Sequence, residues 1–319
     1  ARILMENAGI KAYAVCRDEI HEFSRPGALI LFVAGSGNNG GDALVMARQA
    51  FLDGLNVAVL LSGPVKSDNA AANLDIIRKL EVRTFSIPDQ PEESRHLLRT
   101  AAVVVDGLFG TGISGSLRPP GAALVVEINE LAGKVVSIDL PSGLGDGFRS
   151  SYPAVRADLT LCLGLPKRCL YLPSARMHCG RIVHVPIGFP PPLVTDPQIP
   201  GELLRFSDIE PMRRAIPDDA HKGDRGKLAV FGGDIGTTGA PVLASESAAR
   251  SRCGLVYLFV DEAAYIPVAS HLTSVMARKW RPHDDPAQFD LNQYDAYLAG
   301  PGWGFDGRRP WLEMLITAG

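Results

Sequence analysis

The stretch Ala28-Leu-Ile-Leu-Phe-Val-Ala-Gly-Ser-Gly-Asn-Asn-Gly-Gly-Asp42 joins an apolar run to a glycine-rich turn. Seven apolar residues in succession are typical of a strand that is buried on both faces of a sheet. The glycines behind them let the backbone approach a ligand closely, and a helix that starts there offers unpaired N–H groups to an anion. The stretch therefore predicts a strand–turn–helix unit with a ligand at the turn.

Apolar runs alternate with helical patterns from this stretch to about Gly188. Strands are predicted at residues 28–34, 56–61, 82–87, 103–106, 135–139, 159–163 and 182–186. Helices are predicted between the first five strands, at residues 43–53, 69–80, 92–99 and 121–132. Because Val-, Ile- and Leu-rich strands separated by helices form parallel sheets with both faces covered, we expect an α/β fold. The expected architecture is a Rossmann-like three-layer sandwich with a mostly parallel sheet.

A proline-rich stretch without periodicity, residues 189–200, interrupts this alternation. A second α/β pattern follows, with strands predicted at 227–231, 255–260 and 296–299 and a helix at 240–252. About 100 residues are few for a complete doubly wound domain, so this second domain is expected to be partial. The predicted organisation is a first domain at 1–190, a linker at 191–220 and a partial domain at 221–319.

Composition excludes several classes of partner. The chain has 32 Lys and Arg against 35 Asp and Glu, a formal charge of −3, so we expect neither nucleic acid nor a membrane surface as a partner. No apolar run reaches the roughly 18 residues that a membrane span needs. The five cysteines are odd in number and irregularly spaced, which favours a reducing cytoplasm over a disulfide framework.

The glycine spacing of the first turn allows two other interpretations. Gly35, Gly37 and Gly40 satisfy the G-x-G-x-x-G pattern of dinucleotide-binding folds. Nicotinamide dehydrogenases also need an acidic residue about 20 positions further on, and residues 59–64 contain none. A plain strand-to-helix turn with Asp42 as its helix-start acid is the other interpretation, but two adjacent Asn and four Gly exceed what a turn needs.

Polar clusters follow two more of the predicted strands, at Asp106 and at Asp139. A single Asp at such a place is usually a helix or turn cap. Ligands of open α/β sheets, however, bind beyond the carboxyl ends of the strands. Three such sites on one sheet therefore predict that Asp42, Asp106 and Asp139 face one crevice that binds a ligand.

Four motifs in order carry a specific resemblance: Leu4-Met-Glu-Asn-Ala-Gly9, Gly35-Ser-Gly-Asn-Asn-Gly-Gly-Asp42, Asp106-Gly-Leu-Phe-Gly-Thr-Gly112 and Ile138-Asp-Leu-Pro-Ser-Gly143. With them, residues 1–190 resemble the NAD(P)HX epimerase family, the YjeF N-terminal domain. The resemblance implies an isomerase that repairs hydrated NADH or NADPH by converting (6R)-NAD(P)HX to (6S)-NAD(P)HX. The alternative is a non-catalytic nucleotide-binding or scaffold module, since mRNA-decapping scaffold proteins use the same fold.

The resemblance also assigns roles to residues. Asp139 would move protons at C6 of the substrate. A potassium ion would be held by Asn39, Asp106 and Ser142, with backbone carbonyls completing its shell. Substrate contacts would come, besides Asp139, from Asn38, Asn39, Gly40, Gly41, Asp42, Gly110, Thr111, Gly112, Ile113, Ser114, Gly115 and Ser116.

The second domain resembles the ADP/ATP-dependent NAD(P)HX dehydratase, a ribokinase-like lyase, through His221-Lys-Gly-Asp-Arg-Gly226, Phe231-Gly-Gly-Asp-Ile-Gly-Thr-Thr-Gly-Ala240 and Gly300-Pro-Gly-Trp-Gly304. This implies ADP or ATP with Mg²⁺ as cofactors of the full-length dehydratase, and Ala240 and Gly304 in its hydrated-nucleotide site. The family's Gly-Asp catalytic loop has no counterpart in these 319 residues, so no dehydratase activity is expected from them. A homo-oligomer is left open, because the family's dimer helix would precede Leu4.

Overall fold

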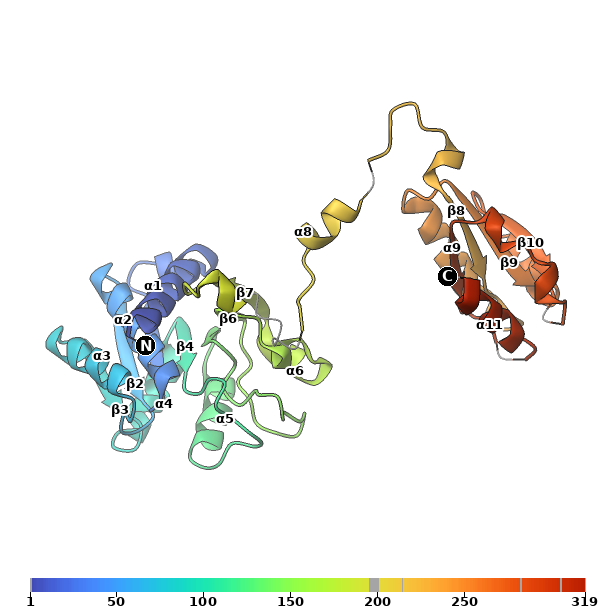
Figure 1. Ribbon diagram of the computed structural model, residues 1–319. Helices are drawn as coiled ribbons and strands as arrows, with labels where there is room; N and C mark the ends of the chain where they lie inside the picture. The colour runs from blue at the N-terminus through green and yellow to red at the C-terminus, as the bar shows by residue number, and fades with distance from the viewer. Residues whose placement is uncertain (1, 195–200, 214, 282, 305, 319) are drawn as a thin grey trace. The chain divides into compact units, whose positions relative to one another are not determined.

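The computed structural model describes residues 2–194, 201–213, 215–281, 283–304 and 306–318 (Figure 1). The chain divides into two compact units, Ala1–Leu203 and Leu204–Gly319. The division falls inside the stretch 191–220, for which a linker is predicted, and residues 195–200 of that stretch lie outside the described residues. Each unit is described by itself.

Unit 1 is built on a seven-stranded sheet in which every strand pair is parallel. The order is β3-β2-β1-β4-β5-β6-β7, so the chain runs outward from β1 to β3 and then crosses to β4 on the other side of β1. This reversal places a topological switch point between β1 and β4. The strands are β1 (Leu29–Ala34), β2 (Asn56–Leu61), β3 (Arg83–Ser86), β4 (Val103–Gly107), β5 (Val135–Ile138), β6 (Leu159–Leu163) and β7 (Arg181–Val185).

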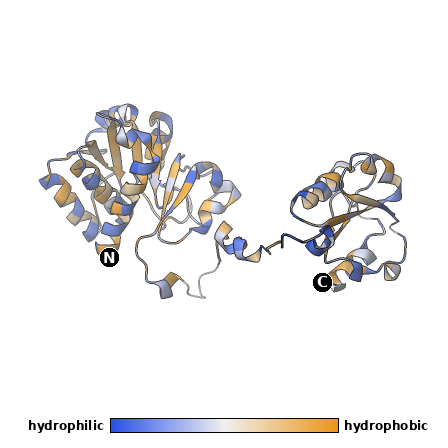
Figure 2. Cartoon of the chain, turned by 90° about the horizontal axis from the view of Figure 1, so that it is seen from above, coloured by the Kyte–Doolittle hydropathy of each residue, from blue (hydrophilic) through white to orange (hydrophobic). Residues whose placement is uncertain are grey.

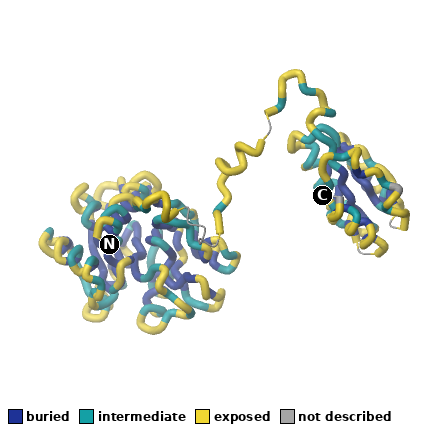
Figure 3. Tube along the Cα trace, in the orientation of Figure 1, coloured by how far each residue is buried: buried dark blue, intermediate teal, exposed yellow. Residues whose placement is uncertain are grey.

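Helices cover both faces of this sheet, which confirms the predicted three-layer α/β sandwich. One face carries α1 (Arg2–Glu19), α2 (Asn38–Leu52) and α3 (Asp68–Lys79), and the other carries α4 (Pro91–Thr100) and α5 (Gly121–Leu131). Alternate residues of β1 feed the two cores: Phe32 packs with the first group and Leu31 with the second. The strands are apolar in Figure 2 and buried in Figure 3, as expected for a parallel sheet between helices. Two short helices, α6 (Pro173–Cys179) and α7 (Pro191–Val194), complete the unit.

Helix α1 was not predicted from the sequence. Its buried residues recur at helical spacing, at Met5, Ala8, Gly9, Ala12, Tyr13 and Cys16. The helix packs closely on α2, because a Cβ at Gly9 would overlap the side chain of Val45. The sequence signal for this helix is weak, because small residues such as Ala8 and Ala12 are on the buried face while Ile3 and Ile10 are exposed.

Helix α2 begins at Asn38 and not at residue 43, so the segment Asn-Asn-Gly-Gly-Asp is its first turn and not a loop. Two of its glycines allow close packing. A Cβ at Gly40 would clash with the carbonyl oxygen of Gly35, and a Cβ at Gly41 would clash with the side chain of Met5. The glycines thus bring the start of α2 down onto the turn after β1 and against α1.

Unit 2 contains a four-stranded parallel sheet in the order β10-β9-β8-β11. Its strands are β8 (Lys227–Phe231), β9 (Leu255–Asp261), β10 (Met276–Trp280) and β11 (Ala296–Ala299), and its helices are α8 (Phe206–Ile209), α9 (Gly239–Arg250), α10 (Tyr265–Ala269) and α11 (Arg309–Ala318). The sequence reading missed β10, an edge strand that is mostly exposed and carries Arg278 and Lys279. Aromatic rings dominate one of its cores, at Phe231, Phe259, Trp280, Trp303 and Trp311.

Across the described residues, no helix has both the length and the apolar character needed to cross a bilayer.

The close approach at Gly40 predicts the effect of a single methyl group. Gly40→Ala should lower the stability of unit 1 by about 1–3 kcal/mol, because its Cβ would have to displace the backbone at Gly35. The matched control is Gly133→Ala, where a Cβ meets nothing within 4 Å. Urea unfolding followed by far-UV circular dichroism measures the difference.

The tryptophans supply an internal control, because the three in the chain, Trp280, Trp303 and Trp311, all lie in unit 2. Their fluorescence transition should be the same in both variants. Equal circular-dichroism midpoints for Gly40→Ala and Gly133→Ala would contradict the packing role of Gly40.

Candidate active site

A cleft of about 1500 Å³ opens in unit 1 at the carboxyl ends of the strands. It lies where ligands of doubly wound sheets bind, beside the switch point between β1 and β4. Its lining comes largely from segments that directly follow strands: 36–39 after β1, 62–64 after β2, 108–114 after β4, Asp139 after β5, and Leu165 and Lys167 after β6.

A fully buried carboxylate, Asp106 near the end of β4, lies beneath the cleft. Its Oδ1 accepts hydrogen bonds from Ser142 Oγ at 2.6 Å and from the Leu108 N–H at 3.2 Å. Its Oδ2 accepts from Ser137 Oγ at 2.8 Å and from the Ser142 N–H at 2.9 Å. Burial raises the pKa of Asp106, while these four hydrogen bonds oppose the rise. They tie β4 to β5 and to the Pro-Ser-Gly turn.

Two of the three residues predicted to bind potassium, Asn39 and Ser142, meet at the carbonyl of Phe109, and Ser142 connects them to the third, Asp106. Asn39 Nδ2 donates to this oxygen at 3.0 Å, and Ser142 Oγ lies 3.3 Å from it while also bonding Asp106. Within the described residues, no cationic side chain forms an ion pair with Asp106, and no cluster of three His, Cys, Asp or Glu could hold a metal ion. A carboxylate, a hydroxyl, an amide oxygen and a carbonyl are the oxygen donors that a hard cation prefers, so this set fits potassium.

Asp139 follows β5 with a left-handed backbone, at φ +67°. Such a conformation costs a non-glycine residue roughly 1–2 kcal/mol. Its carboxylate forms an ion pair with Lys167 Nζ, and the same ammonium group donates to the carbonyl of Leu163. The side chains of Asp139 and Lys167 are only 15 % and 19 % exposed. The ion pair therefore sits in a largely dry part of the cleft.

Lys167 is a residue that the sequence reading missed. It lies four positions beyond the end of β6, in Gly164-Leu-Pro-Lys167. A polar side chain just after a parallel strand was the signal that singled out Asp106 and Asp139. The same argument applied to β6 would have found Lys167.

Asp42 also lines the cleft, from the start of α2. Burial raises the pKa of its carboxyl group to about 8, and the negative charge of Asp139 adds to the rise, while the positive charge of Lys167 opposes it. Two carboxyl groups thus share the field of one ammonium group. At neutral pH, Asp42 holds a proton.

The structure brings most of the predicted substrate-binding residues together. Those that line the cleft are Asn38, Asn39, Asp42, Gly110, Thr111, Gly112, Ile113, Ser114, Ser116 and Asp139. Gly40, Gly41 and Gly115 are not in its lining: the first two pack against Gly35 and Met5, and the third turns the loop with φ +84°. Ala240 and Gly304 belong to unit 2.

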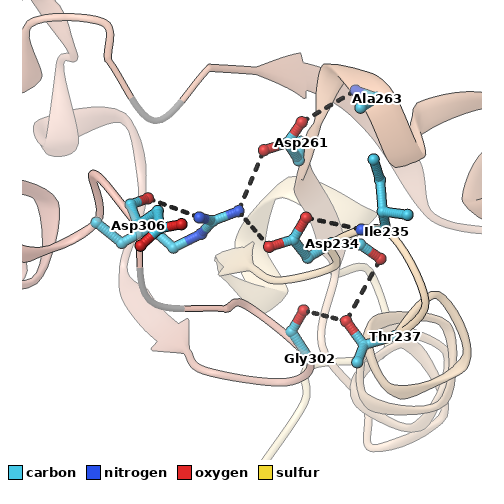
Figure 4. A network of polar contacts seen from close by, with 8 residues as sticks. Asp234, Ile235, Thr237, Asp261, Ala263, Gly302 and Asp306 are labelled. Atoms are coloured by element: carbon cyan, nitrogen blue, oxygen red, sulfur yellow. Dashed lines mark hydrogen bonds and ion pairs between the residues drawn. The ribbon is translucent and has the colours of Figure 1, made fainter.

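Unit 2 has a polar network of its own (Figure 4). Arg308, whose side chain is 6 % exposed, pairs with Asp234 at 2.8 Å and with Asp261 at 3.1 Å. Thr237 Oγ1 donates to the carbonyl of Gly302 at 2.7 Å. The network joins the loop after β8, the end of β9 and the segment after β11, and so holds the two glycine-rich motifs of this unit together. The sequence reading did not single out Arg308.

The shifted pKa of Asp42 predicts how stability depends on pH. The carboxyl pKa is 3.8 in its ordinary state and about 8 in the folded protein, so the folded state binds the extra proton between these values. The stability of unit 1 should therefore fall as pH rises from about 4 to 8, by up to roughly 1.4 kcal/mol per pH unit. Asp42→Asn removes this contribution, so its melting temperature should depend less on pH than that of the wild type.

Asp68→Asn is the control, because it makes the same charge change in the first turn of α3, where the residue is exposed. Melting curves from pH 5 to pH 8.5, followed by circular dichroism, compare the three proteins. Identical pH profiles for Asp42→Asn and Asp68→Asn would show that Asp42 is ionised at neutral pH.

Comparisons with known proteins match both units. A family model described as "YjeF-related protein N-terminus" matches residues 1–169, and one described as "NAD(P)H-hydrate dehydratase" matches residues 228–317. A crystal structure of the yeast protein ynu0 is 25% identical, with a TM-score of 0.48, and the match covers 57% of this chain and 76% of that one.

Curated relatives carry the name "Bifunctional NAD(P)H-hydrate repair enzyme Nnr". The protein from Coxiella burnetii is 33% identical over 290 residues, which cover 90% of this chain and 58% of the relative. The one from Archaeoglobus fulgidus is 37% identical over 278 residues, 86% of this chain and 54% of the relative. The chain thus spans little more than half the length of these relatives. Because the first family model covers 169 of the 319 residues, this chain belongs to the YjeF-related protein N-terminus family.

Proposed function

We propose that unit 1 is a metabolite-repair epimerase that converts (6R)-NADHX or (6R)-NADPHX to the 6S form. The observation that carries the proposal is the Asp139–Lys167 ion pair in a cleft of about 1500 Å³ at the switch point of a parallel sheet. That volume exceeds the roughly 300–1000 Å³ typical of small-molecule pockets and suits a dinucleotide. The name of the curated relatives supports the same substrate.

Epimerisation at C6 requires a proton to move at the C6 oxygen. C6 carries a hydroxyl group and the ring nitrogen, so inversion proceeds by ring opening and closure or by loss and return of water, and both routes need a proton-transfer group. Asp139 is the group we propose, because it lines the cleft and its carboxylate is held in place. Lys167 is a positioning residue that fixes this carboxylate through the ion pair.

Backbone groups on two sides of the cleft are proposed to bind the substrate. The residues are Asn38–Asp42 and Gly110–Ser116, whose N–H groups suit the negative charge of a diphosphate. Gly37, before α2, makes no side-chain cap, so the first N–H groups of α2 have no side-chain acceptor, although the Gly41 N–H already donates to the Gly37 carbonyl at 3.3 Å. A Cβ at Gly110 would lie 3.6 Å from Asp139 Oδ2, so glycine at this position keeps the approach to the carboxylate open.

Potassium is proposed to bind Asn39, Asp106, Ser142 and the Phe109 carbonyl. When bound, the ion supplies a positive charge beside the buried Asp106 carboxylate. The residues themselves order the loop after β4, since Phe109 N–H donates to Ser142 Oγ at 2.9 Å. This loop carries Gly110 and the residues after it into the cleft.

Unit 2 is proposed to be part of an ADP- or ATP-dependent dehydratase that acts on the 6S product with Mg²⁺. Ala240, in the first turn of α9, and Gly304, beside Asp234, are the residues of this chain proposed for its hydrated-nucleotide site. The match to the family model described as "NAD(P)H-hydrate dehydratase" supports the assignment. The free state of all five cysteines supports a cytoplasmic location.

The epimerase proposal predicts a catalytic loss at one position. The protein should speed the approach of purified (6R)-NADHX to its R/S equilibrium, followed by chromatography. Asp139→Asn should lower kcat by about 100-fold or more while the fold and NADH binding persist, because the proton-transfer group is gone. Asp75→Asn, on the exposed face of α3, is the control and should keep the wild-type rate.

Removal of potassium tests the ion site separately. The rate should fall when potassium is replaced by tetramethylammonium and return when it is restored, since Asp106 then regains a counter-charge. An unchanged rate would remove potassium from the proposal and leave the epimerase in place. A folded wild-type protein with no epimerase activity would favour the non-catalytic nucleotide-binding or scaffold module.

A further inference from the structure

Three cationic side chains line the cleft of unit 1, Lys66, Arg118 and Lys167, and among the described residues only Lys167 forms an ion pair with an aspartate of the lining. Asp42 comes from α2 and Asp139 from the end of β5, and both line the cleft together with Lys167. Lys167 pairs with Asp139 and bonds the carbonyl of Leu163. In the described part of the chain, no cationic side chain forms an ion pair with Asp42. Lys167 is therefore the cation whose charge acts on both carboxyl groups, and it pairs with Asp139 alone.

Two carboxyl groups with one ion-paired cation between them are expected to retain one proton. A carboxylate that is withdrawn from water without a partner is costly, so it takes up a proton instead. A second carboxylate nearby strengthens the effect, as in pairs of catalytic acids that share one proton. Asp42 is the member that holds the proton, because Lys167 is engaged by Asp139; burial and the charge of Asp139 raise the pKa of Asp42 to about 8.

We propose that Asp42 is a second catalytic residue, which donates its proton to the C6 hydroxyl group of the hydrated nicotinamide, so that epimerisation proceeds by loss and return of water. The inference rests on the proposed epimerase function and chooses between its two routes. It gives the site an acid, Asp42, and a base, Asp139, on two different elements of the fold.

The step balances in protons and electrons. The C6–O bond breaks, its electron pair stays on oxygen, and the proton of Asp42 converts the hydroxyl into water. The lone pair of the ring nitrogen forms an N1=C6 double bond, which leaves a positive ring and an ionised Asp42. Water then attacks C6 from the other face, the N1=C6 pair returns to nitrogen, and Asp139 accepts the released proton. Transfer of that proton from Asp139 to Asp42 restores the starting state.

The hydroxyl is the better acceptor of the Asp42 proton than the ring nitrogen. The nitrogen lone pair is conjugated through the ring to the carboxamide, which makes the nitrogen a weak base, as in an amide. The same lone pair can still assist departure of a protonated hydroxyl group. An acid in this cleft therefore favours loss of water, whereas ring opening would need a proton on nitrogen.

Oxygen exchange measures this route directly. In H₂¹⁸O, the wild-type protein should incorporate one ¹⁸O at C6 for each inversion, while ring opening retains the original oxygen. Asp42→Asn should lower both epimerisation and exchange by about 100-fold or more, because the amide is close in shape but cannot donate an acidic proton. Asp68→Asn, outside the cleft, should match the wild type in both.

A second readout is independent of turnover. Infrared spectra of the ligand-free protein at pH 7 should contain the C=O stretch of a protonated carboxyl group. This band should be weaker in Asp42→Asn than in the wild type, unchanged in Asp68→Asn, and reduced in the wild type as pH rises through about 8.

The outcomes separate this inference from the function on which it rests. A folded wild-type protein without epimerase activity overturns the proposed function, and this inference with it. An active wild type overturns only the role of Asp42 if Asp42→Asn keeps the full rate, if the infrared band has the same intensity in that variant as in the wild type, or if inversion occurs without ¹⁸O uptake. Activity with ¹⁸O uptake, both lost in Asp42→Asn, supports the inference.

Discussion

The close approach of α2 to the turn after β1 is the constraint on which the site of unit 1 depends. A Cβ at Gly40 would strike the Gly35 carbonyl, one at Gly35 would strike the Leu108 carbonyl, and one at Gly107 would overlap Ala43. Three backbone segments therefore meet at the switch point between β1 and β4, and the Ala43 methyl group is the side chain that packs against Gly107. The meeting places Asn39 within hydrogen-bond distance of the Phe109 carbonyl and puts Asp42 in the cleft. Any larger residue at these glycines would move the polar groups apart.

Two carboxyl groups near this junction, those of Asp106 and Asp42, have different hydrogen-bond partners and neighbouring charges. Asp106 is fully buried, yet four hydrogen bonds satisfy its oxygens, so it organises the loop after β4 and the Pro-Ser-Gly turn. Asp42 lies within the field of Asp139, and Lys167 is engaged by Asp139, so desolvation prevails and the group keeps its proton. The difference lies in the donors and charges around each group and not in the residue type.

The sequence predicts the sheet of unit 1 well, because each buried parallel strand is a continuous apolar run bounded by turn residues. The crevice that collects Asp42, Asp106 and Asp139 follows from strand ends alone. The first residue of α2 is not predictable in this way, because the sequence does not distinguish glycines that allow close helix packing from glycines that form a loop. The strand-end argument would find a cation after β6, but Lys167 and Arg168 are adjacent there. Which of them pairs with Asp139, 28 positions before Lys167, depends on the tertiary structure. The proton on Asp42 likewise depends on groups from three separate elements.

The polar network of unit 2 also combines one cation with two carboxyl groups, but there both carboxyl groups are ion-paired. Arg308 also faces two carboxylates, Asp234 and Asp261, so one cation again meets two acids. The guanidinium group, however, bonds both of them at once, and Asp234 is 31 % exposed, so solvent screens part of the excess charge. In unit 1, the compact ammonium group of Lys167 pairs with Asp139, and Asp42 has no cationic partner of its own among the described residues. In unit 2, the cation bonds both carboxylates and water reaches one of them, so the three groups form a structural network of ion pairs. In unit 1, the cation pairs with only one carboxylate, and the other carboxyl group, which is desolvated, keeps a proton.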